Sequence, residues 1–442
     1  MNTIIQALTN KAAISEKLNT LADWIVAEET KLQASDRATD SNAQRELQHK
    51  IAVLRGLIVQ TDAIELYKQV TDNFKQHLRL QALLDTLSEH FPSLLPTKAQ
   101  LAADSNVKLS LKKGYELSYG MILSAFLSEP VIAYHMMESM QLPMEASLAY
   151  QEQFNAEGKI ELQTVTLERV NNIGLMTLTN TDCLNAEDFT LMHEMEIATD
   201  LILLDPKIDV GVIRGDVMHH KKYDGKRVFC SGVNLTKLYN GELPYLFYVA
   251  RELGLMNKIY RGLTASSEIE EGIEKPWISV VDTHAIGGGC QIVLICDYVI
   301  AADDAYFTIP ARTEGFIPGL ANLRLQKYTG HTLARQMINM NHKVEANSTD
   351  GKLLVDEVQP TAKIEEALFN VVNEISKTGI HGMISNRKAF RIGAEPVETF
   401  RNYMAMFSKQ QAQCMYDNEI IKNLEDFWGE KLARKQHQTA KL

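Results

Sequence analysis

The chain has 442 residues, of which 45% are hydrophobic, so it can bury a large core and has room for more than one domain. Its 45 basic and 56 acidic residues leave a net charge of -11. This charge argues against a nonspecific nucleic-acid binder, although a local basic patch could still hold a phosphorylated ligand.

The amino terminus lacks the basic region and the long apolar stretch of a secretion signal. No apolar run in the chain approaches the roughly 18 residues that span a bilayer. The five cysteines have no paired spacing, which favours reduced thiols over a disulfide framework. We therefore expect a cytoplasmic protein that binds neither nucleic acid nor membranes.

Residues 1–158 are predicted to form an all-helical domain. In segments 51–58 and 78–84, apolar residues return every three or four positions, as on one face of a helix. The polar stretch 34–44 is expected to be an exposed connection. A second polar stretch at 151–158 marks the end of this domain.

Residues 159–330 are predicted to form an α/β domain. Segments 165–170 and 173–178 have a period of two and flank Asn171 and Asn172, which indicates paired strands. A helix at 186–203, a strand at 210–214, a strand from Trp277 and a strand at 298–302 follow. This alternation of strands and helices is typical of an α/β fold.

The strand from Trp277 runs into three consecutive glycines at 287–289, and an apolar, helix-like run follows at 290–300. Glycines let a ligand approach the main chain, and the first amides of a helix point outward and favour negative charge. An oxyanion hole is built in this way. Three glycines can equally form a tight turn for close packing of helix and strand. A dinucleotide-binding fingerprint is excluded, because Ile292 occupies the position of its third glycine.

An oxyanion hole needs a second donor, and segment 229–235 supplies a candidate, with small residues that lead into a helix-like stretch at 235–239. Together with 316–319 and 354–358, these segments resemble the crotonase (enoyl-CoA hydratase/isomerase) superfamily over roughly residues 160–375. The resemblance implies a crotonase-like ββα superhelix core. It also implies that the amides of Val233 and Gly288 polarise the carbonyl of an acyl-CoA thioester and stabilise its enolate.

Hydratases of this superfamily carry two glutamates where this chain has Gln291 and Ala311. An amide cannot take up a proton at neutral pH, so water addition by that route is not available. The helical first domain and five further segments instead resemble the dioxygenases of the superfamily over nearly the full length. These segments are 183–188, 203–206, 251–254, 287–291 and 310–315.

This second resemblance implies an enzyme of glycopeptide-antibiotic precursor synthesis that acts on 3,5-dihydroxyphenylacetyl-CoA with molecular oxygen as co-substrate and without a cofactor. It places Glu187 and Arg251 beside the hydroxyl groups of the substrate ring, and Gln291 beside the ring or the enolate. Each residue also has a structural alternative: Glu187 as a first-turn helix acid, Arg251 as a surface charge beside Glu252, and Gln291 as a helix-capping amide.

Further contacts follow from the same resemblance. A basic, partly aromatic patch just before the first oxyanion segment is expected to meet the CoA nucleotide, although a solvated loop is the alternative for any one of its members. The expected substrate-binding residues are His220, Lys221, Lys222, Tyr223, Asn234, Leu235, Ile286 and Gly287. An apolar pocket for oxygen is expected at Leu235, Phe316 and Ile317.

No metal site is predicted. His193 and Glu194 begin like a zinc-binding helix motif, but Ile197 stands where the motif requires its second histidine. The expected products are 3,5-dihydroxyphenylglyoxylate and free CoA, and the sequence does not identify the base that removes the α-proton. Isomerisation or thioester hydrolysis of an acyl-CoA, or a non-catalytic CoA-binding subunit, are the alternatives.

The region 331–442 is predicted to be mainly helical and to make subunit contacts. Its final helices carry apolar faces, which could cover either the core of the same chain or a neighbouring subunit. The resemblance implies a homo-oligomer, either a trimer or a dimer of trimers (a hexamer).

Overall fold

The computed structural model describes residues 1–105, 107–264, 272–377 and 379–429. The region before the first strand is helical, as predicted, and the exposed connection at 34–40 separates its second and third helices. Pro130 starts one of these helices, where its missing N–H costs no hydrogen bond. The helices are α1 Asn2–Leu8, α2 Ile14–Gln33, α3 Ser41–Val70, α4 Leu80–His90, α5 Lys98–Ser105, α6 Leu117–Ser128, α7 Pro130–Gln141 and α8 Glu145–Glu157.

The core contains a seven-stranded sheet in the order β1-β2-β3-β4-β5-β7-β10. Its first three strands are antiparallel and the others run parallel. The two strands predicted at 165–170 and 173–178 pair with Val165 opposite Leu178. The strands are β1 Lys159–Glu161, β2 Val165–Val170, β3 Ile173–Leu178, β4 Val210–Gly215, β5 Trp277–Val281, β7 Tyr298–Ala302 and β10 Glu357–Gln359.

A second sheet has three short strands in the order β6-β8-β9, which are His284–Ile286, Tyr306–Thr308 and Val344–Glu345. The strand expected to run from Trp277 into the glycines is two strands, because the chain bends at Asp282 and Thr283 and passes from β5 of the first sheet to β6 of the second. Strand β6 leads directly into the glycines, and α13 (Gly288–Val293) follows them. The helix-like run expected at 290–300 is therefore too long, whereas the strand predicted at 298–302 is confirmed as β7. The chain turns after α13, and 298–300 lie in β7 because this β-branched stretch pairs with β5 in the buried sheet.

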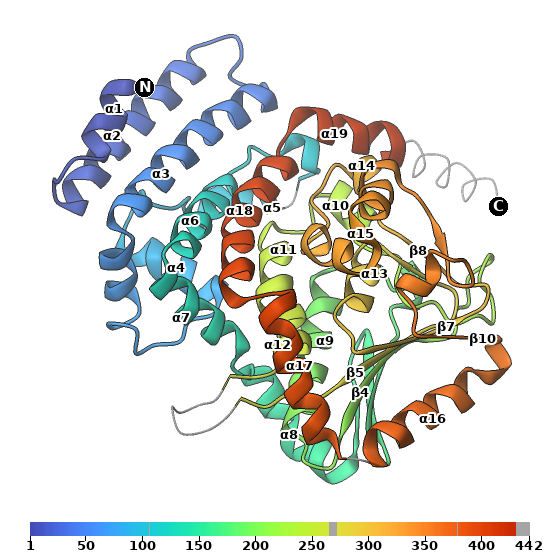
Figure 1. Ribbon diagram of the computed structural model, residues 1–442. Coiled ribbons are helices and arrows are strands. Elements are labelled where there is room, and N and C mark those ends of the chain that lie inside the picture. Colours follow the sequence, from blue (N-terminus) through green and yellow to red (C-terminus); the bar gives the residue numbers. More distant parts are fainter. Residues whose placement is uncertain (106, 265–271, 378, 430–442) are drawn as a thin grey trace.

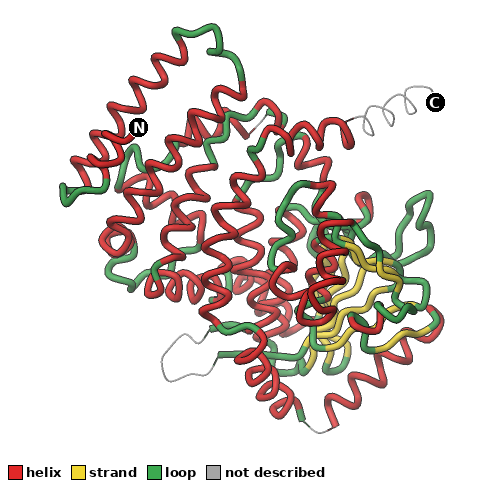
Figure 2. The backbone as a smooth tube through the Cα atoms, turned by 45° about the horizontal axis from the view of Figure 1, so that its top comes forward, coloured by secondary structure: helices red, strands yellow, loops and turns green. Residues whose placement is uncertain are grey.

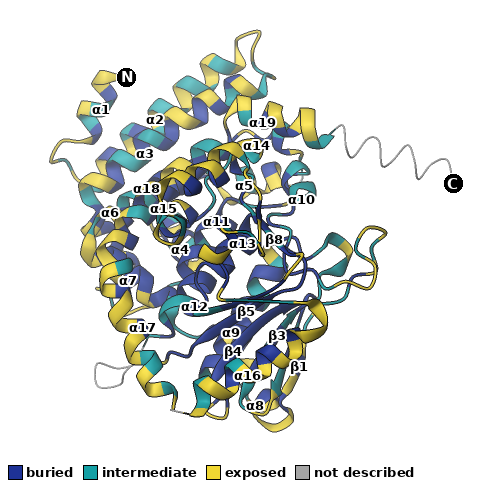
Figure 3. Ribbon diagram, turned by 45° about the vertical axis from the view of Figure 1, so that its right-hand side comes forward, coloured by how far each residue is buried: buried dark blue, intermediate teal, exposed yellow. Residues whose placement is uncertain are grey.

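Helices pack on the seven-stranded sheet and bury its central strands β4 and β5 completely, whereas β1 and β10 at its two edges are partly exposed (Figures 2 and 3). Helix α9 (Phe189–Leu204) packs against β2 and β3, and α16 (Ile364–Lys377) packs against β7. The remaining helices of the core are α10 Leu235–Tyr239, α11 Leu246–Arg251, a π-helical turn Glu252–Met256, α12 Asn257–Arg261, α14 Ala311–Glu314 and α15 Ala321–Met340.

The C-terminal region is helical, as predicted, with α17 (Ile380–Ala394), α18 (Val397–Met415) and α19 (Asn418–Leu424) after α16. Helix α18 runs beside α6 of the N-terminal region (Figure 1). The two backbones can approach closely because Gly120 has no side chain. A Cβ at this position would lie only 2.4 Å from Ala412 Cβ. The last helices of the chain therefore complete the helical layer that the first helices begin.

Residue 330 was expected to end the core. Strands β9 and β10 lie beyond it and pair with β8 and β7, so the sheets extend to Gln359. Gly330 only bends α15, with φ of 70°. Among the described helices, none alone is long and apolar enough to cross a membrane, although Leu117–Ser128 and Pro130–Glu157 pass that test together as a pair bent by 111°.

Candidate active site

The two segments with the expected oxyanion donors lie side by side. A β-bridge joins Glu187 to Val233: the Glu187 N–H donates to Gly232 O at 2.7 Å, and the Asn234 N–H donates to Glu187 O at 2.8 Å. Within the described residues, the N–H of Val233 itself has no acceptor. The N–H of Gly288 opens helix α13, where no intrahelical acceptor exists. Both residues line the same cavity.

Each of the three glycines is required for a different reason. Gly287 has φ of 52°, a conformation that residues with a side chain rarely adopt. A Cβ on Gly288 would lie 1.5 Å from Glu187 Oε2, and one on Gly289 would lie 2.7 Å from Cys230 Cβ. The glycines thus serve close packing and also bring the Gly288 backbone against a charged side chain.

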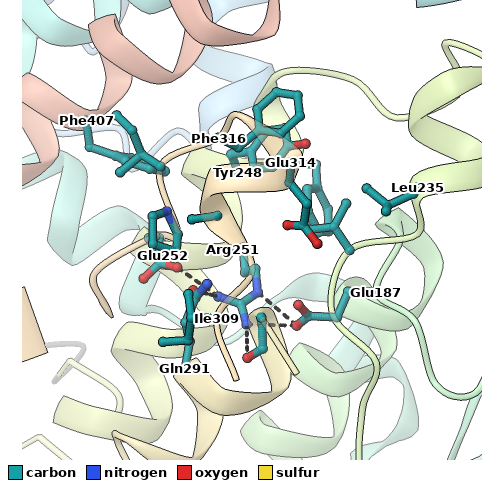
Figure 4. A pocket seen from close by; sticks show the side chains of 18 residues that line it. Glu187, Leu235, Tyr248, Arg251, Glu252, Gln291, Ile309, Glu314, Phe316 and Phe407 are labelled. Carbon is teal, nitrogen blue, oxygen red and sulfur yellow. Dashed lines mark hydrogen bonds and ion pairs between the residues drawn. The ribbon is translucent and has the colours of Figure 1, made fainter. Parts of the chain in front are cut away.

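Arg251 is the centre of a buried polar cluster in this cavity (Figure 4). Its guanidinium donates to Glu187 Oε1 at 2.9 Å, to Glu252 Oε1 at 2.8 Å, to Gln291 Oε1 at 2.9 Å and to the carbonyl of Gly288 at 2.9 Å. Arg251 is only 4% exposed and Glu187 1%. Arg251 is therefore not the surface charge that the sequence left open. Glu187 precedes the N-cap of α9, Asp188, so it is not the first-turn helix acid either.

Electrostatics in the cluster follow from burial. Burial opposes the charge of Arg251, but the carboxylates of Glu187 and Glu252 outweigh it and raise the pKa of the guanidinium. Burial raises the pKa of Glu252. Among the described residues, Glu187 Oε2 and Glu252 Oε2 have no hydrogen-bond partner. The cluster therefore keeps unused acceptors inside the cavity.

The rest of the cavity is mostly apolar. Leu235, Phe316 and Ile317, the expected oxygen pocket, all line it. Tyr248 stacks on Phe316 with ring centres 5.9 Å apart, and its hydroxyl has no partner in the part of the chain described. The other lining residues are Phe247, Gly287, Ile309, Ala311, Glu314, Pro318, Gly319 and Phe407.

The C-terminal helices hold the loop that closes this cavity. On α18, Gln411 accepts from Ile317 N at 3.1 Å and the Tyr403 hydroxyl donates to Gly319 O at 2.6 Å. Phe407 of the same helix lines the cavity. For this helical tail the sequence left open whether it covers the core of the same chain or a neighbouring subunit. In the structure its helix α18 packs on the same chain and forms part of the site, and the subunit contacts stay a prediction.

The basic patch lies outside the cavity but next to the oxyanion segments. Lys222 Nζ lies 4.9 Å from the ring centre of Tyr223, which lies 5.1 Å from that of His284 in β6. His284 Nε2 is 3.0 Å from Ser231 Oγ, and burial lowers the pKa of His284 to about 4. The row continues to Tyr306, which stacks on His284. His220 stacks on Tyr223 and Lys221 is exposed.

Two other expected substrate-binding residues do not line the cavity. Asn234 caps α10, where its Oδ1 accepts from Lys237 N at 3.1 Å. Ile286 lies in β6 and donates its N–H to Cys230 O at 2.9 Å. Both residues hold the oxyanion segments in place, and their contact with substrate stays a prediction.

The sequence profile of the enoyl-CoA hydratase/isomerase family matches residues 168–431 of this chain. The chain belongs to this family. It is therefore an enzyme of the crotonase type, whose substrates are carried on CoA, and the crotonase fold expected from the sequence is confirmed.

Individual relatives extend this result. The (3,5-dihydroxyphenyl)acetyl-CoA 1,2-dioxygenase of Amycolatopsis orientalis is 38% identical over 412 residues, which cover 93% of each chain. A probable enoyl-CoA hydratase of Rhizobium meliloti is 28% identical over 47% of this chain and 73% of its own. The crystal structure of an enoyl-CoA hydratase/isomerase from Xanthobacter autotrophicus Py2 aligns with a TM-score of 0.50 and 16% identity, over 60% of this chain and 93% of its own.

Sequence reasoning missed about half of the residues that line the cavity, among them Glu252 of the Arg251 cluster. Phe247 and Tyr248 lie on α11 beside the predicted Arg251, and Phe407 lies on α18, but the apolar character of these side chains alone indicates only a core. Glu314 lay inside a segment that carried the resemblance, but no role was assigned to it. Among the described residues, no three His, Cys, Asp or Glu side chains form a group that could hold a metal ion.

Proposed function

We propose that the protein is a dioxygenase that converts an arylacetyl-CoA, with 3,5-dihydroxyphenylacetyl-CoA as its substrate, into 3,5-dihydroxyphenylglyoxylate and free CoA. The observation that carries this proposal is the pairing of two free backbone donors, on Val233 and Gly288, with the Arg251 cluster in one largely apolar cavity. The similarity to the Amycolatopsis orientalis dioxygenase along 93% of the chain supports it.

The cavity offers one place for each part of such a substrate. The thioester oxygen accepts from the N–H groups of Val233 and Gly288, which stabilise the charge that develops on it. The ring hydroxyls meet the unused oxygens of Glu187 and Glu252 and the side-chain amide of Gln291. Gln291 is neutral, so it does not repel an enolate as a carboxylate would.

The proposed reaction begins with loss of an α-proton to give an enolate that is delocalised toward the electron-rich ring. The α-carbon forms a bond to molecular oxygen, which occupies the apolar wall of Leu235, Phe316 and Ile317. The terminal peroxide oxygen attacks the thioester carbonyl and expels CoA. The second α-proton is then released to water, its C–H electron pair forms the keto double bond, and the electron pair of the breaking O–O bond stays on the carboxylate oxygen. Both oxygen atoms therefore enter the product. No metal or organic cofactor takes part in this proposal.

The CoA nucleotide is assigned to the row of basic and aromatic side chains beside the oxyanion segments. Lys222 and Lys343 flank the aromatic rings of Tyr223, His284 and Tyr306. Ammonium groups attract the phosphates of CoA, and aromatic rings provide a surface on which adenine can stack.

We also expect a homo-oligomer, either a trimer or a hexamer. Large apolar side chains on α16 and α17 are exposed, including Phe369 at 58% and Phe390 at 76%. Exposed apolar groups of this size support a subunit contact at these helices. Sedimentation equilibrium measures the mass and would contradict the expectation with a monomer.

The test is oxygen uptake by metal-stripped protein given 3,5-dihydroxyphenylacetyl-CoA, with released CoA measured by a thiol reagent. Equal oxygen consumption and CoA release are expected. CoA release without oxygen uptake would identify a thioesterase instead. Movement of a double bond in an enoyl-CoA, without either signal, would identify an isomerase, and binding without any turnover would indicate a non-catalytic CoA-binding subunit.

A further inference from the structure

One carboxyl group in the cavity takes part in none of the contacts of the Arg251 cluster. Glu314, the last residue of α14, lines the cavity, and its side chain has no hydrogen bond or ion pair with any described residue. In Figure 4 its carboxylate lies in the space between Arg251 and Leu235. It is therefore the one cavity carboxylate that no described cation holds.

The surroundings of Glu314 are apolar. Tyr248 and Phe316 lie beside it in the cavity wall (Figure 4), and burial raises the pKa of its carboxyl group to about 7. A carboxyl group with this pKa is present in both its protonated and its ionised form at neutral pH. It can therefore accept a proton and release it again within one turnover.

The backbone fixes the position of this carboxylate. Glu314 and Ala311 are three residues apart on α14 and both line the cavity. Gly315 then ends the helix in a left-handed conformation with φ of 76°. A Cβ at Gly315 would meet Ile420 at 2.7 Å, so α19 packs directly against the turn that follows Glu314. The C-terminal helices thus hold Glu314 as well as the loop after it.

The other titratable groups of the cavity are poor candidates for a base. Glu187 and Glu252 are each held by the guanidinium of Arg251 at 2.8 Å, so both carboxylates are fixed as parts of the Arg251 cluster and are not free to turn toward an α-carbon. Burial raises the pKa of Tyr248 far above neutral pH, so its phenol keeps its proton. His284 lies outside the cavity lining.

We propose that Glu314 is the base that removes the α-proton of the bound acyl-CoA. The inference rests on the proposed function only in requiring an enolate. The α C–H bond breaks, and its electron pair forms the double bond of the enolate while the negative charge moves onto the thioester oxygen between Val233 and Gly288. The proton forms an O–H bond with Glu314 and is passed to the sulfur of CoA when the thiolate leaves. Glu314 is then again a carboxylate.

The test measures proton removal without oxygen chemistry. The wild type and Glu314→Gln are incubated anaerobically in D2O with 3,5-dihydroxyphenylacetyl-CoA, and mass spectrometry follows deuterium at the α-carbon. The wild type exchanges the α-protons, with a rate that rises with pH around 7, and Glu314→Gln exchanges at least 100-fold more slowly, without that pH dependence. Glu314→Asp retains part of the exchange. Arg312→Gln, on the exposed side of the same short helix, exchanges like the wild type.

Binding of the corresponding thioether, which has no carbonyl and cannot form an enolate, shows that Glu314→Gln keeps a folded site. If this variant binds the thioether normally and still exchanges within about threefold of the wild type, Glu314 is not the base, while the enolate chemistry stands. If the wild type neither exchanges the α-protons nor consumes oxygen, the proposed function fails and the base assignment fails with it.

Discussion

A single added methyl group at Gly288 should displace the side chains of the Arg251 cluster and so lower both activity and stability. In Gly288→Ala the new Cβ would lie 1.5 Å from Glu187 Oε2 and 3.2 Å from Arg251 Nη2. Carbon and oxygen atoms approach to about 3.3 Å in favourable contacts, so the carboxylate must move by roughly 2 Å. Glu187 lies 2.8 Å from the Arg251 guanidinium, so this movement breaks the buried ion pair.

The expected loss of stability follows from the two charges that the broken ion pair leaves buried without a partner. Separating a buried ion pair costs about 3–5 kcal/mol, because each charge loses its partner without gaining water. For 442 residues, at about 2.1 cal/mol/K of unfolding entropy per residue, this lowers the unfolding midpoint by roughly 3–5 °C. A displacement of 1 Å or more among groups that orient a substrate lowers turnover by about 100-fold.

The assay compares kcat for CoA release and the thermal midpoint of Gly288→Ala with those of Gly393→Ala. Gly393 lies in α17, where a Cβ would meet nothing within 4 Å, so the same substitution there should leave kcat unchanged and stability equal or slightly higher. A Gly288→Ala protein with kcat within threefold of the wild type would refute the argument that Glu187 and Arg251 must keep their positions.

Three further predictions concern the walls of the cavity. Gln291→Ala removes the acceptor 2.9 Å from Arg251 Nη1 and should lower kcat about 10- to 100-fold while KM changes less than threefold. A fall in kcat matched by an equal rise in KM would mean that Gln291 has only a structural role. Glu314→Gln should have a higher free energy of unfolding in urea than the wild type above pH 7, because burial penalises the ionised carboxyl group. Since burial raises the pKa from 4.5 to about 7, this difference in unfolding free energy should be absent near pH 4 and should grow as the pH rises from 4.5 to 7. Gln411→Ala leaves the Ile317 N–H unpaired and should raise KM severalfold, whereas an unchanged KM would show that α18 does not hold the cavity loop.

Local patterns predicted the elements that carry their own signal. The alternation on either side of Asn171 gave β2 and β3 with correct ends, because one face of each strand is buried and the asparagine has positive φ in the turn. The short strands β1, β6, β8, β9 and β10 were not predicted. Each has two or three residues, which is too few to show a period. Pairing determines them: β1 pairs with its neighbour β2, and β9 and β10 pair with the more distant strands β8 and β7.

The residues of the site also fall into those that sequence motifs identify and those that only tertiary packing identifies. Val233, Gly288, Arg251, Glu187 and Gln291 were named from motifs, and the structure brings all five to one cavity. Phe247 and Tyr248 of α11 and Phe407 of α18 also line the cavity, and α18 reaches it through the packing of the helical layer. No local pattern distinguishes Tyr248 or Phe407 from an ordinary core residue, so only the tertiary arrangement identifies them.

The segment after the glycines shows that an apolar run alone does not distinguish a helix from a buried strand. The run at 290–300 has the composition of one buried element, but it contains the end of α13, a turn and the start of β7. Helices and fully buried strands share this composition, and the pairing of β7 with β5 and β10 decides between them.

The most direct test of the proposed chemistry follows the oxygen atoms. The metal-stripped protein is given 3,5-dihydroxyphenylacetyl-CoA under ¹⁸O₂, and the product is reduced at once with borohydride, so that its keto oxygen cannot exchange with water before mass analysis. The proposed reaction gives a product with two labelled oxygen atoms, one from the keto group and one in the carboxylate. A product that takes its new oxygen from water, or that carries a single labelled atom, would contradict it.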